Sequence, residues 1–184
     1  MLADREVFTE IFNELYPRLC RFLECLLGSS SLAQDIAQES LLRLYRFGVD
    51  RLPHEEIRFW VFRVARNLAH NELKRKQTQM KLLDRLAGWL RPYQSNTAEK
   101  ELVRAEEANL LWRLLKSLPE DQRTALLLRE QEEMSYREIA RVTGVSESKV
   151  KIDIYRGRNL LREKWQEQNR SSPRLERRFK HRRD

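Results

Sequence analysis

The residue types that most often carry catalysis or bind metal ions are sparse in this chain of 184 residues, and their spacing suits neither role. The three histidines, His54, His70 and His181, lie far apart. Cys20 and Cys25 are five residues apart, which is neither a C-x-x-C pair nor a usual zinc spacing, so we expect two plain thiols. The sequence also contains no glycine-rich phosphate loop, no H-E-x-x-H motif and no paired E-x-x-H motifs. We therefore predict no cofactor, no metal site and no catalysis.

Basic side chains at helical spacing favour a different chemistry, the binding of phosphate groups. In the segment 57–76, basic and amide side chains recur at i, i+3, i+4, i+7 and i+11, so they share one face of a helix. A DNA-binding surface and an ordinary solvated surface both fit such a stripe, and the residues leave the two open. The stripe consists of Arg63, Arg66, Asn67, His70 and Lys74.

A second basic segment follows a pattern typical of a helix-turn-helix unit. Ser135 and Glu138 form a capping box, Ala140 is small where two helices would cross, and Gly144 allows a left-handed turn. The second helix of the unit then presents side chains suited to DNA phosphates and to guanine edges in the major groove. A capped helical hairpin with a solvated basic face is the alternative. The candidate DNA contacts are Glu147, Ser148, Lys149, Lys151, Arg156 and Arg158.

An acidic and polar face is predicted on the helix at 32–47. It lies opposite the apolar positions of that helix, which are Ile36, Ala37, Leu41 and Leu44. Such a face suits a basic protein surface better than DNA, although a solvated face explains it equally well. Its members are Asp35, Gln38, Glu39 and Leu42.

Helices must position these groups, because nothing in the composition indicates strands. The chain has five glycines, five prolines and few runs of Val, Ile and Thr, so we expect an all-α protein. Apolar periodicity predicts two small helical domains joined by a polar, flexible linker, and the basic segment 170–184 is expected to be disordered. The expected helices span about 8–28, 32–47, 57–76, 108–118, 119–128, 135–143 and 146–165.

The location of the protein is also constrained by its apolar segments. The longest apolar runs, such as Leu126–Leu128, are far shorter than the roughly 20 residues of a membrane-spanning helix. The N-terminus is charged within its first residues, so no export signal is recognised. We expect a cytoplasmic protein without membrane insertion. The formal net charge of the chain is +8.

Four blocks of sequence resemble one family. The blocks are AQDIAQESLLRLY at 33–45, FWVFRVARNLA at 59–69, LPE at 118–120 and MSYREIA at 134–140. In their order and spacing they resemble bacterial extracytoplasmic-function (ECF) sigma factors, which contain only the second and fourth sigma domains. The resemblance covers roughly residues 6–78 and 106–166.

The resemblance implies a division into parts. Residues 1–78 would be sigma domain two, 79–105 a linker, 106–168 sigma domain four with its helix-turn-helix, and 169–184 a basic tail. The helix at 32–47 would bind core RNA polymerase through Asp35, Gln38, Glu39 and Leu42. The helix at 57–76 would bind the minus-ten promoter element, and the helix from Glu147 to Arg158 would read the minus-thirty-five element. The minus-ten residues would be Arg63, Arg66, Asn67, His70, Asn71 and Lys74.

The resemblance also implies partners and leaves a competing interpretation. The partners would be core RNA polymerase, promoter DNA and an anti-sigma factor, in the cytoplasm of a bacterium. The family often has an acidic residue at Gln34, Asp at Asn71 and Thr at Lys149, and the last two differences bear on base preference. The alternative is a helix-turn-helix regulator that binds an operator without polymerase, for which palindromic sites would be expected. A helical hydrolase or metal enzyme is the least favoured class.

Overall fold

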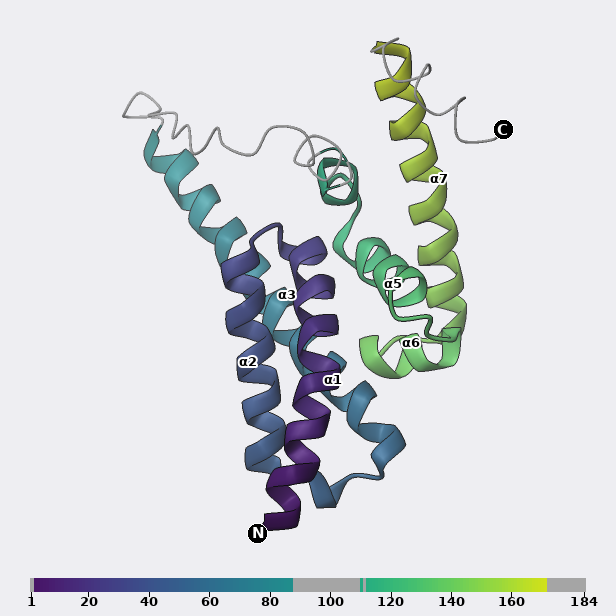
Figure 1. Ribbon diagram of the computed structural model, residues 1–184. Coiled ribbons are helices and arrows are strands. Elements are labelled where there is room, and N and C mark those ends of the chain that lie inside the picture. Colours follow the sequence, from purple (N-terminus) through teal and green to yellow (C-terminus); the bar gives the residue numbers. More distant parts are fainter. Residues whose placement is uncertain (1, 88–109, 111, 172–184) are drawn as a thin grey trace, which may run out of the picture.

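The structure, a computed structural model, describes residues 2–87, 110 and 112–171 (Figure 1). Within these ranges the chain forms α-helices and one short 3-10 helix, and it contains no strand, which confirms the all-α prediction. The same ranges hold no helix with the length and hydropathy needed to cross a bilayer. The predicted linker from residue 88 onward and the predicted tail from residue 172 lie outside the described residues.

The N-terminal domain is built from three long helices. Helix α1 (Leu2–Leu27) and helix α2 (Ser30–Phe47) run side by side in opposite directions, and α3 (His54–Ala87) crosses both after the 3-10 helix η1 (Val49–Arg51) (Figure 1). Gly28, at φ 69°, turns the chain between α1 and α2, and the Ser29 hydroxyl accepts a hydrogen bond from the Leu32 amide. The core holds fully buried aromatic rings from α1 and α3, with Phe22 and Phe62 edge to face at 5.5 Å.

The C-terminal domain places three helices around a small apolar core. Residues 112–116 are helical, and α5 (Glu120–Glu130), α6 (Tyr136–Thr143) and α7 (Glu147–Ser171) follow. Leu128, Met134, Ile139 and Ile154 are almost fully buried where these helices meet. Burial of this apolar surface is the main stabilising contribution.

The predicted helix-turn-helix is confirmed in its local details. The Ser135 hydroxyl accepts from the Glu138 amide, and the Glu138 carboxylate accepts from the Ser135 amide. Gly144 ends α6 in the left-handed conformation at φ 76°. The Ser146 hydroxyl then accepts from the Lys149 amide at the start of α7. Each turn residue therefore has the role that its chemistry predicts.

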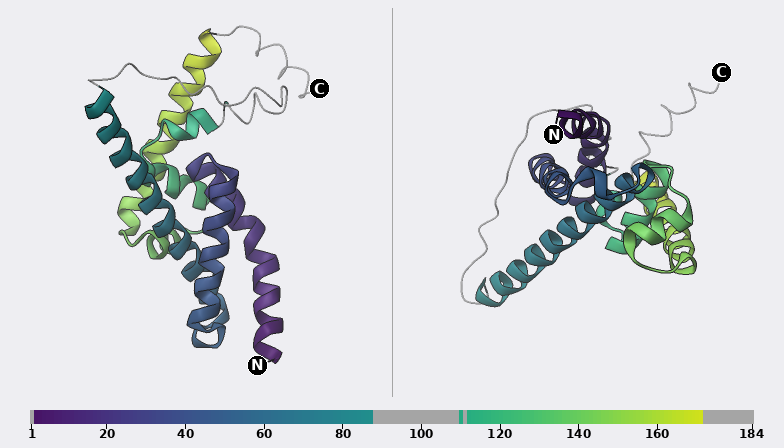
Figure 2. Two further views of the ribbon diagram at one scale, coloured as in Figure 1. Left: turned by 90° about the vertical axis from the view of Figure 1, so that its left-hand side faces the viewer. Right: turned by 90° about the horizontal axis from the view of Figure 1, so that it is seen from below.

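Two helices extend further than the sequence pattern predicts. Helix α3 was expected to end near Lys76 and continues to Ala87, so the first residues of the predicted linker are helical. The apolar periodicity fades after Gln77, but no glycine or proline occurs before Gly88, and helix-forming residues continue the backbone hydrogen bonding. Helix α7 likewise continues past Trp165 to Ser171. Figure 2 shows the last turns of α3 projecting away from the other helices.

The two domains pack against each other. Helix α6 lies against α3, and α5 lies against α1 (Figures 1 and 2). The ring of Trp112 lies so close to Gly28 that a Cβ atom added to Gly28 would overlap the ring. The sequence predicted two domains but not their contact, which determines the surroundings of several candidate site residues.

Candidate nucleic-acid interface

The outward face of α7 is exposed to solvent. Val150 and Ile154 are almost fully buried and fix which side of α7 faces its own domain. All six residues predicted to contact DNA are exposed on this helix: Glu147, Ser148, Lys149, Lys151, Arg156 and Arg158. The unit therefore has the geometry of a helix that can enter a DNA groove.

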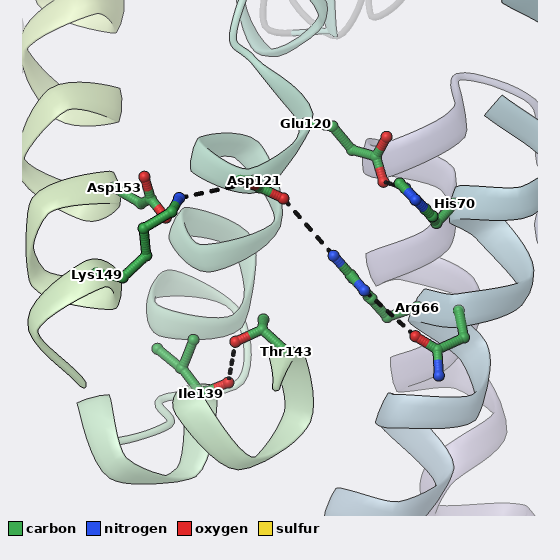
Figure 3. A network of polar contacts seen from close by, with 9 residues as sticks. Arg66, His70, Glu120, Asp121, Ile139, Thr143, Lys149 and Asp153 are labelled. Atoms are coloured by element: carbon green, nitrogen blue, oxygen red, sulfur yellow. Dashed lines mark hydrogen bonds and ion pairs between the residues drawn. The ribbon is translucent and has the colours of Figure 1, made fainter. Parts of the chain in front are cut away.

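Two of the predicted cations on α7 are held by carboxylates of their own domain. The Lys149 ammonium lies 2.6 Å from the Asp153 carboxylate and 3.4 Å from that of Asp121 (Figure 3). The hydrogen bond with Asp153 raises the pKa of Lys149. Arg158 pairs with Glu130 at 2.5 Å, and this hydrogen bond raises the Arg158 pKa. Their positive charges are partly compensated before any DNA is bound.

A third cation, Lys151, lies over an aromatic ring. Its ammonium is 5.8 Å from the centroid of Tyr136, and the guanidinium of Arg129 lies 5.3 Å from the same ring. The interaction restrains the Lys151 side chain along the edge of α7. Ser148 and Arg156 extend into solvent on the same outward side.

Two apolar residues of α7 were missed by the sequence analysis. Ile152 is 47% exposed and Tyr155 is 68% exposed, between the cationic positions. They follow Ser148 at i+4 and i+7, so all three share one face. The signal that could have found Ile152 is the helical spacing of the apolar Val150 and Ile154, because a residue midway between two buried positions four apart lies on the opposite side of the helix.

Three residues of the basic stripe of α3 contact the C-terminal domain. Arg63 donates from Nε and Nη2 to the carbonyl oxygen of Arg141, at 3.0 and 2.6 Å. Arg66 lies 3.6 Å from the Asp121 carboxylate, and His70 Nδ1 lies 2.5 Å from Glu120 Oε1 (Figure 3). Three of the predicted minus-ten residues are therefore engaged by the other domain.

The remaining stripe residues are less constrained. Arg66 also donates to the amide oxygen of Asn67 at 3.3 Å, so these neighbours support each other. Asn67, Asn71 and Lys74 are exposed on α3. Within the predicted minus-ten set, Arg63, Arg66 and His70 therefore have polar partners in the C-terminal domain, and the described part of that domain gives no such partner for Asn67, Asn71 and Lys74.

A buried carboxylate at the end of α5 strengthens the contact between the domains. The Glu132 side chain is 3% exposed and lies 2.8 Å from Arg18 Nη2 and 3.4 Å from Arg58 Nη2. Arg58 also donates to the Glu132 backbone carbonyl. The next residue, Glu133, has a positive φ of 55°, which turns the chain at this point. One acid thus connects the C-terminal domain to both α1 and α3.

A further ion pair joins the start of α3 to α6. The Arg141 guanidinium donates to the Glu56 carboxylate, and this hydrogen bond holds the pKa of Glu56 below its ordinary value. Arg141 also lies over the ring of Phe59, 5.1 Å from its centroid. The contact between α3 and α6 therefore includes hydrogen bonds, an ion pair and a cation–π contact.

The predicted acidic face of α2 points away from the C-terminal domain. Asp35 and Gln38 are exposed, Leu42 is 45% exposed, and the half-buried Glu39 pairs with Arg43 at 2.8 Å. In Figure 1, α2 lies on the far side of α1 from α5 and α6. This face is accessible while the two domains are in contact.

An aromatic surface adjoins the acidic face at the end of α2. Tyr45 is 56% exposed and packs on Phe8 at 5.0 Å, and the ring of Phe47 stacks on that of Trp60 at 5.4 Å. Trp60, at the start of α3, therefore has an aromatic partner within its own domain. The cysteines Cys20 and Cys25 are free thiols, each partly buried.

Comparisons with known proteins match each of the two domains to a sigma-factor region. The family model described as sigma-70 region 2 matches residues 11–79, and the model described as sigma-70, region 4 matches residues 108–161. The ECF RNA polymerase sigma factor SigM of Bacillus subtilis is 27% identical over 157 residues, covering 85% of this chain and 91% of that protein. The ECF RNA polymerase sigma-E factor of Haemophilus influenzae is 30% identical over 172 residues, covering 89% of this chain and 90% of that protein.

A solved structure with the same fold is similar over most of its length. It is the sigma factor RpoE in complex with the anti-sigma factor NepR from Bartonella quintana, with a TM-score of 0.68 at 20% identity. The match covers 88% of this chain and 98% of that one.

Proposed function

The chain belongs to the ECF RNA polymerase sigma factors. We propose that one face on each of three helices, α2, α3 and α7, makes a separate contact in promoter recognition. As a sigma factor it binds core RNA polymerase and directs promoter-specific initiation of transcription. The proposal concerns which residues carry each contact. It also assigns the protein to the cytoplasm, with no catalytic step of its own.

Helix α7 reads the minus-thirty-five element as duplex DNA. The observation that carries this assignment is the helix-turn-helix geometry of α6 and α7, with the Ser135 capping box, the left-handed Gly144 and an outward face rimmed by cations. Contacts of Ser148, Lys151 and Arg156 reach the groove and its phosphates directly. Lys149 and Arg158 must exchange an intramolecular carboxylate for DNA, so their contribution is smaller than that of a free cation.

Helix α3 binds the minus-ten element after the domains separate. Arg63, Arg66 and His70 are engaged by the C-terminal domain in the closed arrangement, whereas Asn67, Asn71 and Lys74 are exposed. Binding of a DNA strand along this face replaces the carbonyl of Arg141 and the carboxylates of Asp121 and Glu120 with phosphates. Arg66 then exchanges a carboxylate for a phosphate, and Arg63 exchanges a neutral carbonyl for a charged acceptor, so these donors keep a hydrogen-bond acceptor with either partner.

Helix α2 binds core RNA polymerase. Its acidic and polar face, formed by Asp35, Gln38, Glu39 and Leu42, is accessible with the domains in contact, so polymerase can dock before they separate. The exposed Leu42 contributes apolar area in the middle of a polar face, an arrangement common at protein interfaces.

The proposed boundaries are sigma domain two at 1–78, the linker at 79–105, sigma domain four at 106–168 and the tail at 169–184. Regulation by an anti-sigma factor is part of the proposal, since the similar solved RpoE is bound to one. The surface available to such a partner includes both domains.

Run-off transcription tests the proposed function. Core polymerase with the chain should yield a specific transcript from its promoter, and core polymerase alone should not. Asp35→Lys combined with Glu39→Lys should abolish co-purification with core polymerase while the helical circular-dichroism spectrum stays unchanged. A chain that occupies a palindromic operator with full affinity in the absence of polymerase would support the independent regulator instead.

A further inference from the structure

The centre of the outward face of α7 is apolar. Ile152 is 47% exposed and Tyr155 is 68% exposed, and they are three residues apart on one face. Their neighbours on that side are Ser148, Lys151 and Arg156, which are polar or cationic. The face thus has an apolar middle and a charged rim.

The arrangement reverses the usual burial preference of adjacent residues. Asp153 is 6% exposed, on the inner side of α7, where its carboxylate binds Lys149. Ile152, directly before it, is left in solvent. Burial of isoleucine is favourable and burial of a carboxylate is costly. Single apolar side chains are common on protein surfaces, but Ile152 adjoins the exposed Tyr155, and together they form an apolar patch inside a cationic rim.

The chemistry of the major groove matches this face. Among the four bases, only thymine presents a methyl group there, and apolar side chains recognise it by contact. Phosphates line both edges of the groove and attract cations. A helix with a branched apolar side chain at its centre and Lys151 and Arg156 at its rim is complementary to both features.

We propose that Ile152 determines promoter specificity by contacting a thymine methyl group in the upstream promoter element, with the Tyr155 ring bordering the same contact. The occupant of this face is duplex DNA. The inference rests on the proposed role of α7 and adds to it the residue and the base feature that are recognised.

Uracil substitution isolates the methyl group. Promoter duplexes are prepared in which each thymine of the upstream element is replaced by uracil, one at a time, which preserves base pairing and removes one methyl. Binding of the reconstituted holoenzyme is measured for each duplex. The wild-type protein should lose about fourfold in affinity at one or two positions, as expected for the loss of one buried methyl group.

Substitution of Ile152 should remove that discrimination. Holoenzyme with Ile152→Ala should bind the thymine and uracil duplexes equally, and Ile152→Val should keep part of the ratio. Val7→Ala is the matched control, because Val7 is a branched side chain of similar exposure, 41%, on α1. It should keep the full wild-type ratio.

The possible results separate this inference from the proposed role of α7. The inference is overturned if the wild-type holoenzyme binds every uracil duplex as tightly as the thymine duplex. It is also overturned if Ile152→Ala keeps the wild-type ratio of thymine to uracil affinity. Loss of polymerase or anti-sigma binding in Ile152→Ala, with the uracil ratio intact, assigns the face to a protein and also overturns it. If Lys151→Ala combined with Arg156→Ala leaves upstream-element binding unchanged, the role of α7 itself fails.

Discussion

Glu132 is the carboxylate most enclosed by the contact between the domains. Its side chain is 3% exposed and interacts with Arg18 and Arg58 from two helices of the other domain. A buried charged group that loses its partners is strongly destabilising, so this site is sensitive to single-atom changes.

Replacing Glu132 with Gln should weaken the contact between the domains by about 1 to 3 kcal/mol, because two guanidinium groups lose a charged acceptor. The measurement is the distance between fluorophores placed one on each domain, followed in increasing salt. Glu133→Gln makes the same chemical change at the exposed neighbour and should behave as the wild type. Equal salt profiles for both variants would contradict the role of Glu132.

The pH dependence of this contact follows from Glu56. The hydrogen bond from Arg141 lowers the Glu56 pKa, so the carboxylate form is favoured when the domains are in contact. A carboxyl group with a depressed pKa stabilises the closed arrangement above its ordinary pKa, and this stabilisation disappears as pH falls through the lowered value. The inter-domain distance should therefore increase on acidification. Glu56→Gln should remove part of that pH response, and an unchanged response would show that other carboxylates control it.

At the scale of elements, the turn between α6 and α7 depends on Gly144. Its φ of 76° lies in the left-handed region, and a Cβ atom there would meet nothing within 4 Å. The effect of a substitution is therefore backbone strain without steric overlap.

Gly144→Ala should lower the free energy of unfolding by about 1 to 2 kcal/mol, the usual cost of left-handed backbone for an L-residue with a Cβ. Gly144→Asn should cost less, because asparagine tolerates this conformation. Chemical denaturation of the three proteins measures both effects. An alanine variant as stable as the wild type would mean that the turn relaxes.

The elements also show what the sequence could predict. The capping box of Ser135 and Glu138 was predictable because both partners are three residues apart, and the acidic face of α2 because helical periodicity fixes it. The pairing of Arg18 with Glu132 was not, since these residues are 114 positions apart and no local rule relates them. Ile152 was missed because apolar residues were assigned to the interior. The end of α3 was missed because periodicity, and not helix propensity, was used to place it.

At the scale of the whole molecule, the basic stripe of α3 has two competing partners. In the closed arrangement Arg63, Arg66 and His70 contact the C-terminal domain, and the proposed minus-ten strand requires the same side chains. Weakening the contact should therefore favour binding of DNA to the free protein.

Glu120→Gln combined with Glu132→Gln should increase the affinity of the free chain for a single-stranded minus-ten oligonucleotide by severalfold, because His70 and Arg58 lose an acidic partner in the other domain and Arg18 is left with Glu14 of its own helix. Fluorescence anisotropy of a labelled oligonucleotide measures the change. Glu133→Gln combined with Glu163→Gln alters the net charge equally at exposed positions and controls for general electrostatic attraction. The same gain in both double variants would assign the effect to net charge alone.

The enclosed contact at Glu132 also has a quantitative consequence for the free protein. A ligand that binds only the separated form has an observed dissociation constant equal to the intrinsic constant divided by the population of that form. Every ~1.4 kcal/mol of docking free energy therefore weakens its apparent binding about tenfold. Docking through Glu132, Glu56 and Glu120 should therefore lower the affinity of the free chain for DNA along α3, whereas the face of α7, which is exposed with the domains in contact, should keep its own affinity.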